Sequence, residues 1–422
     1  MNDKELYTKI LGIEPPWEIK DLQLALEKGR IDIEVRLQSS HEPVCPVCQS
    51  EGKRRICKIH DRRAERIWRH LDTCQYKTYI HCRIPRVKCP EHGVLSMEVS
   101  WAEGQSRFSL LFESYAIHLL QASQNRSKSA EILRISWDEM DGIMRRGVER
   151  GLSRRDSTAI PNVGMDEKSF LKGHRYVSIL VDHSRKCVLE VAEGRDEMAV
   201  NSLWTSLKSD QRQSVKAVSM DFWQAYRSGA LRHVPQAKIV HDKFHISKYL
   251  NESVDKVRRQ EHGRLNKQKD TSLSGTRYLW LKRSDNWTEK DAEKFAELAE
   301  KQLKVGRAWN RKELFNEFWI CESRDKAYAF FKRWFFSATH SQLAPVIKVA
   351  KMFKRHIEGI LNWIEHKISN GLTEGINSRI QQIKPVCVRT RTGRSVARGF
   401  RNVKNYRIAI LFHLGGLDML PH

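Results

Sequence analysis

Short apolar runs separated by turn residues mark the middle of the chain. Runs at 163–166, 176–182, 186–191, 215–220 and 236–240 have the length and alternation of β-strands. Apolar residues at helical spacing predict one helix over 197–207, and a second helix is expected around 223–229. The pattern therefore predicts three meandering strands, a helix, a strand, a helix and a last strand.

This order of elements is the ribonuclease H-like order, in which the first and fourth strands lie side by side. Asp166 ends the first run and Asp221 follows the fourth, so we expect their carboxylates to meet at one edge of the sheet. Two neighbouring carboxylates repel each other unless they share a proton or a divalent cation. Oxygen ligands favour Mg²⁺ or Mn²⁺ over zinc, so the pair predicts a site for these ions.

A third carboxylate is needed if two ions are to act on a phosphodiester. Glu374 is the candidate, in a helix-compatible stretch where Ile376 and Ile380 share a face. Glu167 is interpreted as structural or supporting, because neighbouring strand residues point to opposite faces. Asp182 lies at a hairpin turn, where aspartate commonly caps the backbone.

Asp242 and His245 follow the fifth run, and three interpretations stay open for them: support of the site, contact with DNA, or a solvated helix start. Residues 251–368, between Asp221 and Glu374, predict an all-helical insertion. Aromatic stripes at this spacing are usually core, so we expect Trp280, Trp287 and Trp334 to be buried rather than to stack on bases.

The N-terminal part contains two knuckles, Cys45-Pro-Val-Cys48 and Cys89-Pro-Glu-His92, separated by forty residues. Two such pairs predict one tetrahedral Zn²⁺ held by Cys45, Cys48, Cys89 and His92 in a zinc ribbon with a β insertion. A strand pattern over 79–88 leads into the second knuckle. The remaining candidates are interpreted as core or surface residues: Cys57, Cys74, Cys82, His60 and His81.

Residues 105–152 predict helices at 108–121 and 128–134, then a third helix that begins at Ser136, with Glu139 completing a capping box. The buried face of the third helix is expected to carry Met140, Ile143, Met144 and Val148. Arg145, Arg146 and Arg150 are expected outside it, and the first two are candidate DNA contacts. This is the helix-turn-helix plan, although any αα-hairpin can show the same pattern.

The composition predicts a nucleic-acid partner, because a formal charge of +24 attracts polyanions such as DNA. Eight basic residues and no acidic residue occur between positions 384 and 407. Lys384 and a helical face with Arg394, Arg398 and Arg401 are the candidate phosphate contacts, and a solvated basic face is the alternative. No apolar run approaches a membrane span and no signal peptide is recognisable, so we expect a cytoplasmic protein with metal-binding rather than paired cysteines.

Five blocks, in order along the chain, resemble the DDE transposases of the ISL-three family of bacterial insertion sequences. They are Gly164-Met-Asp-Glu-Lys-Ser-Phe170, Ser219-Met-Asp-Phe-Trp-Gln-Ala-Tyr226, His241-Asp-Lys-Phe-His245, Asn370-Gly-Leu-Thr-Glu-Gly-Ile-Asn377 and Arg398-Gly-Phe-Arg-Asn-Val-Lys-Asn-Tyr-Arg407. The resemblance implies a ribonuclease H-like catalytic domain with Asp166, Asp221 and Glu374 as its triad. It also implies cutting and joining of DNA at the ends of a mobile element.

The predicted fold is therefore multidomain α+β, with a ribonuclease H-like mixed-sheet core and an all-helical insertion, preceded by a zinc ribbon and a helix-turn-helix. The expected parts are 1–40, an N-terminal segment; 41–95, zinc-binding; 105–152, helix-turn-helix; 160–250 and 369–422, the catalytic core, ending in a basic helix; and 251–368, the insertion.

The predicted function is a DNA transposase with two Mg²⁺ or Mn²⁺ ions and a structural Zn²⁺. We expect it to bind terminal inverted repeats and target DNA as a homodimer. Alternatives are a ribonuclease H-like nuclease without strand transfer and a catalytically silent, DNA-binding regulator.

Overall fold

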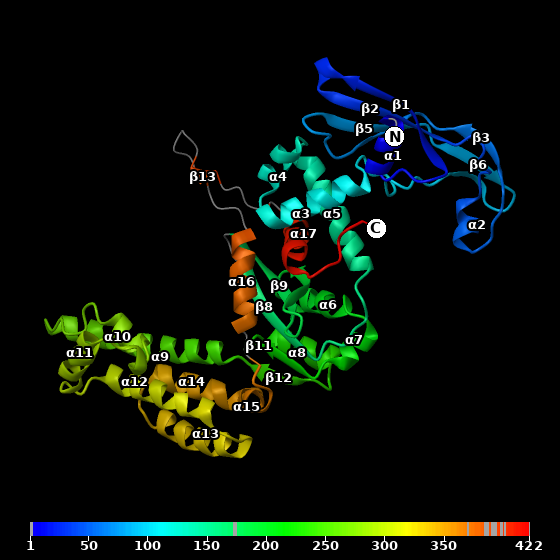
Figure 1. The fold of residues 1–422 in the computed structure, drawn as a ribbon. Helices are drawn as coiled ribbons and strands as arrows, with labels where there is room; N and C mark the ends of the chain where they lie inside the picture. Colours follow the sequence, from blue (N-terminus) through cyan, green and yellow to red (C-terminus); the bar gives the residue numbers. More distant parts are fainter. Residues whose placement is uncertain are drawn as a thin grey trace. The chain divides into compact units, whose positions relative to one another are not determined.

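The computed structural model describes residues 3–171, 175–368, 371–383, 388–389, 395–396, 400 and 402–421. For Leu171 and for 371–374, 388–389 and 395–396 only the backbone is described. The chain forms two compact units, Met1–Arg155 with Leu417–His422 and Asp156–Gly416 (Figure 1). No helix among the described residues is long and apolar enough to cross a membrane.

The first unit contains a four-stranded sheet that draws on widely separated sequence. Its order is β1 (Trp17–Ala25), β2 (Arg30–Leu37), β5 (Lys77–Cys82) and β4 (Arg66–Arg69), with α1 (Asp3–Ile10) beside β1. Because β2 pairs in parallel with β5, the boundary expected at residue 40 is not a structural one. The N-terminal hairpin is therefore part of the same sheet as β4 and β5, which lie between the two cysteine knuckles in the sequence.

A second sheet carries the other knuckle. It consists of β3 (Lys58–Arg62), β6 (Pro85–Cys89) and β7 (Gly93–Ser96), while α2 (Pro46–Ser50) follows Cys45. The strand expected over 79–88 is therefore two strands, β5 and β6, which belong to different sheets. Trp101 packs edge-on against both Trp17 and Trp68, with ring centroids 5.3 and 5.6 Å apart, within the hydrophobic core of this region.

Three helices complete the first unit: α3 (Leu110–Ser123), α4 (Arg126–Leu133) and α5 (Trp137–Ser153). The predicted capping box is confirmed, because Ser136 Oγ accepts from Glu139 N at 3.2 Å and the Glu139 carboxylate accepts from Ser136 N at 2.8 Å. Arg134 ends α4 in the left-handed region, with φ 54°. The predicted core face of α5, namely Met140, Ile143, Met144 and Val148, is fully buried.

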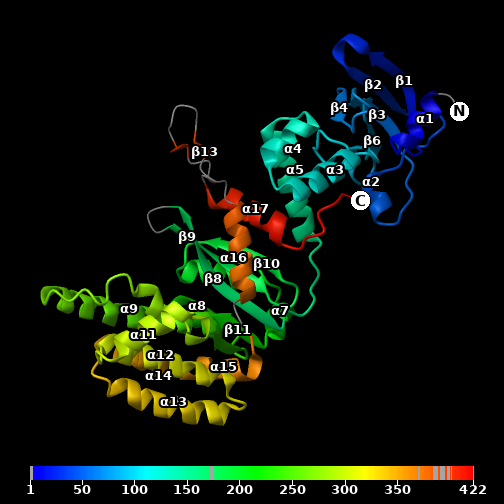
Figure 2. The same cartoon turned by 60° about the vertical axis from the view of Figure 1, so that its left-hand side comes forward.

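The second unit is built on a five-stranded mixed sheet (Figure 2). Its strands are β8 (Asn162–Leu171), β9 (Arg175–Asp182), β10 (Cys187–Glu193), β11 (Ala217–Met220) and β12 (Lys238–His241), in the order β10-β9-β8-β11-β12. β9 is antiparallel to its neighbours β8 and β10, whereas β11 is parallel to both β8 and β12. The predicted pairing of the first and fourth strands is confirmed.

Helices α6 (Glu197–Thr205) and α8 (Gln224–His233) share a hydrophobic core with this sheet, and α7 (Ser209–Ser214) precedes β11. The structure describes all of residues 243–366, and this segment contains helices and no strand. The helices are α9 (Lys243–Lys267), α10 (Arg277–Leu281), α11 (Glu289–Ala299), α12 (Lys304–Leu314), α13 (Arg324–Thr339), α14 (Ala344–Arg355) and α15 (Ile357–His366), and 3₁₀ turns lie at Ser284–Asn286 and Phe315–Ile320. Trp280 and Trp334 are buried and Trp287 is partly buried in one aromatic core, as predicted.

Beyond the insertion lie α16 (Gly371–Ile383), a ribbon of β13 (Val388–Arg389) and β14 (Ser395–Val396), and α17 (Val403–Leu414). The last helix, α17, is largely buried and packs against β10. Arg407 is not available as a phosphate contact, since its guanidinium pairs with Glu190 at 2.5 and 2.6 Å. The side chains of Lys384, Arg394, Arg398 and Arg401 lie outside the described residues.

Candidate active site and metal centre

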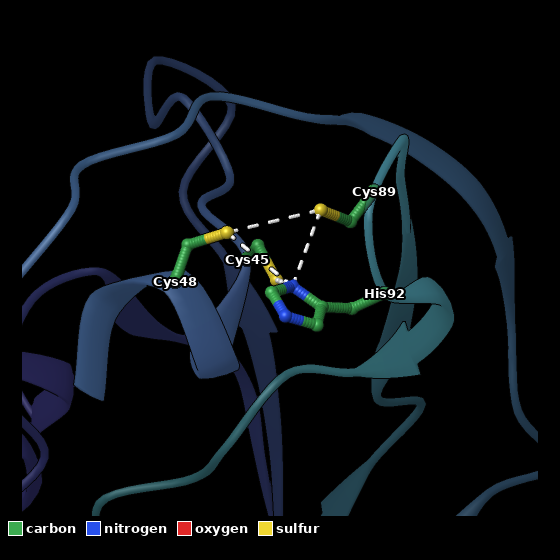
Figure 3. A group of neighbouring side chains, drawn as sticks. All are labelled: Cys45, Cys48, Cys89 and His92. Carbon is green, nitrogen blue, oxygen red and sulfur yellow. Dashed lines mark hydrogen bonds between the residues drawn. The ribbon is translucent and has the colours of Figure 1, made fainter. Parts of the chain in front are cut away.

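The two predicted knuckles meet in the first unit. Sγ of Cys45, Cys48 and Cys89 and Nδ1 of His92 all lie within 4.8 Å of one another, and their side chains converge on one point (Figure 3). Cys48 Sγ lies 3.8 Å from Cys89 Sγ, and His92 Nδ1 lies 3.4–3.7 Å from the three sulfur atoms. Among the described residues this is the one group of three or more histidine, cysteine and acidic side chains whose ligand atoms are close enough to share an ion.

These separations fit a tetrahedral zinc ion. Bonds of about 2.3 Å to sulfur and about 2.0–2.1 Å to nitrogen give a tetrahedron with edges of roughly 3.6–3.8 Å. Burial and the neighbouring thiols raise the pKa of Cys48 to about 12, so this thiol stays protonated unless a cation such as Zn²⁺ takes the place of the proton. The chemistry and spacing of the four donors therefore match structural zinc.

The competing cysteines and histidines stand apart from this group. Cys57 and Cys82 are buried in the surrounding core, and Cys74 is exposed. His81 hydrogen-bonds to Asp32 at 2.7 Å and contacts Glu65 at 3.4 Å, so its ring is held by carboxylates. Their interpretation as core or surface residues agrees with the structure.

The acidic site in the second unit follows from strand register. β11 pairs with β8 through Val218 with Val163 and Ser219 with Gly164, so continuing the register two residues onward sets Asp221 opposite Asp166. Burial raises the pKa of Asp166, the backbone N–H of Glu167 and the charge of His245 oppose this rise, and the charge of Asp221 adds to it. The two carboxylates are thus electrostatically coupled, and a divalent cation between them would relieve the repulsion.

Helix α16, which follows the insertion in the sequence, also contacts the acidic site. Asn377 Nδ2 donates to Asp166 Oδ2 at 2.6 Å, which fixes one face of α16 against β8. Glu374 lies in the first turn of that helix, three residues before Asn377, but its side chain is outside the described residues. The backbone of the third predicted acid therefore belongs to an element that contacts Asp166.

The other acids near the sheet have partners of their own. Glu167 pairs with Arg195 at 3.1 and 3.2 Å. Asp182 is buried and accepts from the backbone N–H groups of the turn at 2.7 and 3.1 Å, so its predicted capping role is confirmed. Asp242 is the N-cap position of α9, and His245, in the first turn of that helix, is close enough to Asp166 to influence its pKa.

Comparison with known proteins adds three family models that together cover most of the chain. A model described as transposase matches residues 163–410, the helix-turn-helix domain of transposase family ISL3 matches 97–148, and the zinc-finger of transposase IS204/IS1001/IS1096/IS1165 matches 41–92. The chain belongs to the ISL3 family of transposases.

Curated relatives of this transposase carry the same description. The transposase for insertion sequence element IS1001 of Bordetella parapertussis is 26% identical over 343 residues, which are 80% of this chain and 84% of that protein. The transposase for insertion sequence element IS1557 of Mycobacterium tuberculosis is 25% identical over 410 residues, 90% of this chain and 91% of that protein. The similarity therefore extends over both units. Membership in this family shows that the chain is an enzyme that acts on DNA.

In the helix-turn-helix of this transposase, the predicted DNA-contacting arginines are engaged within the unit. Arg145 bonds to Asp141 at 2.7 Å and Arg146 bonds to Glu113 at 2.8 Å. Arg150, expected outside, is nearly buried and bonds to Glu113 at 3.2 Å. Both acids are buried. The bond from Arg145 lies within α5, whereas the bonds to Glu113 tie α5 to α3, and DNA contact by Arg145 and Arg146 stays a prediction.

Sequence reasoning passed over one exposed aromatic residue at the acidic site. Of the twelve tryptophans, only Trp137 and Trp223 are exposed, at 43% and 38%. Trp223 lies two residues after Asp221, and its backbone N–H donates to Asp221 Oδ1 at 2.8 Å. A tryptophan two residues after a strand-end acid was the available signal.

Proposed function

We propose that this ISL3-family enzyme cleaves the ends of its insertion sequence by metal-dependent hydrolysis and joins the resulting 3′-hydroxyl ends to target DNA. The observation that carries the proposal is the meeting of Asp166, Asp221 and α16 at one edge of the sheet. The sheet order, with two parallel strands added beside the first strand of a meander, supports a ribonuclease H-like core.

Asp166, Asp221 and Glu374 are the proposed metal ligands. Positions 374 and 377 share a helix face, and Asn377 contacts Asp166, so helical geometry favours Glu374 as the third ligand. Carboxylate oxygens suit Mg²⁺ or Mn²⁺. Two such ions, when bound, would polarise the scissile phosphate and stabilise the charge on the attacking and leaving oxygens.

The residues of the chain would then position the reacting groups, and no covalent intermediate between protein and DNA would form. Asp166 in β8 and Asp221 after β11 would hold the ions beside each other, and a phosphodiester bound there would be open to in-line attack, first by water and later by the 3′-hydroxyl. His245 lies near enough to Asp166 to favour its ionised form, which is the form able to hold an ion. Both strand cutting and strand joining can use this one arrangement.

DNA recognition is assigned to the zinc ribbon and the helix-turn-helix, which would select the terminal inverted repeats, and to the basic stretch with Lys384, Arg394, Arg398 and Arg401. Because the two ends of an element must be joined in one event, a homodimer on DNA is expected. Light scattering of the complex with paired ends tests this, and a complex with one protein chain for two ends would contradict it.

The test of the chemistry compares Asp166→Asn, Asp221→Asn and Glu374→Gln with Asp210→Asn. Asp210 is exposed in α7 of the same unit, so its variant matches the loss of charge without touching the site. We expect the three site variants to bind inverted-repeat DNA normally and to lose Mg²⁺-dependent cutting, while Asp210→Asn cuts normally. Normal cutting by any site variant removes that residue from the active site.

A precut end separates the remaining possibilities. The proposed transposase converts a precut 3′-hydroxyl end and target DNA into a joined product. A nuclease of the same fold cuts intact ends but yields no joined product, and a silent DNA-binding regulator does neither.

A further inference from the structure

Trp223 is held as a rigid, exposed ring beside the acidic site. Its indole Nε1–H donates to the backbone oxygen of Arg195 at 2.8 Å, which fixes the orientation of the ring. The Arg195 guanidinium lies over two rings, 4.4 Å from the centroid of Tyr176 and 4.4 Å from the centroid of Trp223. Tyr176, Arg195 and Trp223 therefore form one cation–π stack, in which the ring of Trp223 is exposed.

Phe222, which lies between Asp221 and Trp223 in the sequence, has different surroundings from these two residues. Phe222 packs into the insertion core, with its ring 4.4 Å from His241 and 4.7 Å from His356. Asp221 and Trp223, on either side of Phe222, are not in that core, and the backbone bond from Trp223 N to Asp221 Oδ1 holds them together. The indole thus belongs to the acidic site and not to the packing of the insertion.

The electrostatics of the stack decide which ligand it suits. Arg195 Nη1 donates to both carboxylate oxygens of Glu167, at 3.1 and 3.2 Å, so the charge of Arg195 is already compensated. What the stack presents is the flat apolar indole rather than free positive charge. A planar aromatic group fits this surface better than a phosphate does.

We propose, on the basis of the proposed function, that Trp223 is a stacking platform for one unpaired nucleobase next to the phosphodiester that Asp166 and Asp221 address. An ordered ring loses little conformational freedom on binding, so the stack is preorganised for this contact. Base stacking on an aromatic side chain corresponds to about a 5- to 150-fold gain in affinity. The platform would hold the strand next to the cut, while the carboxylates would hold the ions to which the phosphate binds.

The experiment uses the full-length protein and an inverted-repeat duplex whose end carries three unpaired nucleotides, each replaced in turn by an abasic site. Binding is followed by fluorescence anisotropy in the presence of a chelator of divalent ions, so that no cutting occurs. We expect one abasic position to weaken binding to the wild-type protein about 5- to 150-fold. Trp223→Leu is expected to lose the same factor on intact DNA and to become insensitive to that abasic position.

Trp223→Phe keeps a ring and is expected to keep the sensitivity. Tyr278→Ala is the matched control, because Tyr278 is also an exposed ring beside an arginine, at 68% exposure in the insertion, and should behave like the wild type. The proposal is overturned if no position is sensitive, if Trp223→Leu is as sensitive as the wild type, or if Tyr278→Ala shows the same loss.

A measurement on the wild-type protein covers the case in which Trp223→Leu does not fold. With 5-iodouracil at the sensitive position, ultraviolet crosslinking should attach the DNA to the peptide that contains Trp223, and a crosslink only elsewhere overturns the proposal. Binding without metal does not use the triad. Normal cutting by Asp166→Asn would therefore contradict the proposed function, whereas loss of the crosslink would contradict only the platform.

Discussion

Asn377→Ala removes the one described bond that joins α16 to the acidic pair. Asn377 is 7% exposed and its Nδ2 donates to Asp166 Oδ2 at 2.6 Å. Burial already raises the pKa of Asp166, and the bond from Asn377 is among the contacts that lower it again. Loss of this donor should therefore raise the pKa of Asp166 further.

The size of the effect follows from the kind of bond. A hydrogen bond to a charged group contributes about 1.5–3 kcal/mol, which corresponds to roughly 10- to 150-fold in the balance between ionised and protonated Asp166. Because a divalent ion must displace the proton, the variant should need about tenfold more Mg²⁺ or Mn²⁺ for half-maximal cutting below the pKa of Asp166. The effect lies at the lower end of this range because the side chain of Asp166 is only partly buried.

The sign of the pH effect is fixed by the direction of the shift. A carboxyl whose pKa is raised binds the ion poorly at low pH and recovers as pH rises through that pKa. The deficit of Asn377→Ala should therefore be largest in acid and should shrink at alkaline pH, where Asp166 is ionised in both proteins. A loss that is the same at every pH would show that Asn377 acts by another route.

The assay measures cutting of an inverted-repeat duplex over a grid of pH and Mg²⁺ concentration, and Mn²⁺ binding without DNA by water-proton relaxation. Ser378→Ala is the control, because Ser378 is the exposed neighbour on the same helix. Equal metal requirements for Asn377→Ala and the wild type at low pH would refute the reasoning.

Three further predictions concern stability. His92→Ala should lose zinc and unfold the surrounding sheet, whereas His92→Cys supplies another zinc ligand and should retain the zinc. Zinc content and thermal unfolding of both variants test this, and a zinc-loaded His92→Ala would contradict it. Glu190→Gln leaves the partly buried Arg407 without its counterion and should cost about 1–3 kcal/mol in urea unfolding, and an unchanged midpoint would contradict this. Gly359→Ala would set a Cβ 2.5 Å from the imidazole at the end of β12 and should cost about 1–3 kcal/mol, while Gly263→Ala in α9 meets nothing within 4 Å and should stabilise by about 0.5–1 kcal/mol; thermal unfolding compares the two.

Local patterns in this chain predicted local structure well. The capping box at Ser136 and Glu139 depends on residues three apart, and the structure has both of its bonds. Asp221 directly follows β11 as predicted, whereas β8 continues through Asp166 to Leu171, so the predicted strand end at Asp166 is wrong. The two strands nevertheless pair as the order of elements predicted. Chain direction and strand order were sufficient to bring these two acids together.

Pairing between distant segments was the part that sequence could not provide. The parallel pairing of β2 with β5 joins residues 30–35 to residues 77–82, and neither segment carries a signal for the other. The same holds for ion pairs. Arg407 counts as positive charge in the sequence, yet Glu190 on β10 neutralises it in the fold. Charge density along the chain therefore overestimated the surface available to phosphate.

The helical insertion gains a role from its contacts with the catalytic sheet. Asn362, on α15, donates to the backbone oxygen of Ile239 in β12 at 2.8 Å, and Phe222 is packed among insertion residues directly after Asp221. The aromatic stripe that could have suggested base stacking is instead the core that anchors the segment around Phe222. Because that segment carries Asp221 and Trp223, close packing of the insertion core also restricts the movement of these two residues. Core substitutions in the insertion should therefore impair cutting even though their side chains lie away from the acids.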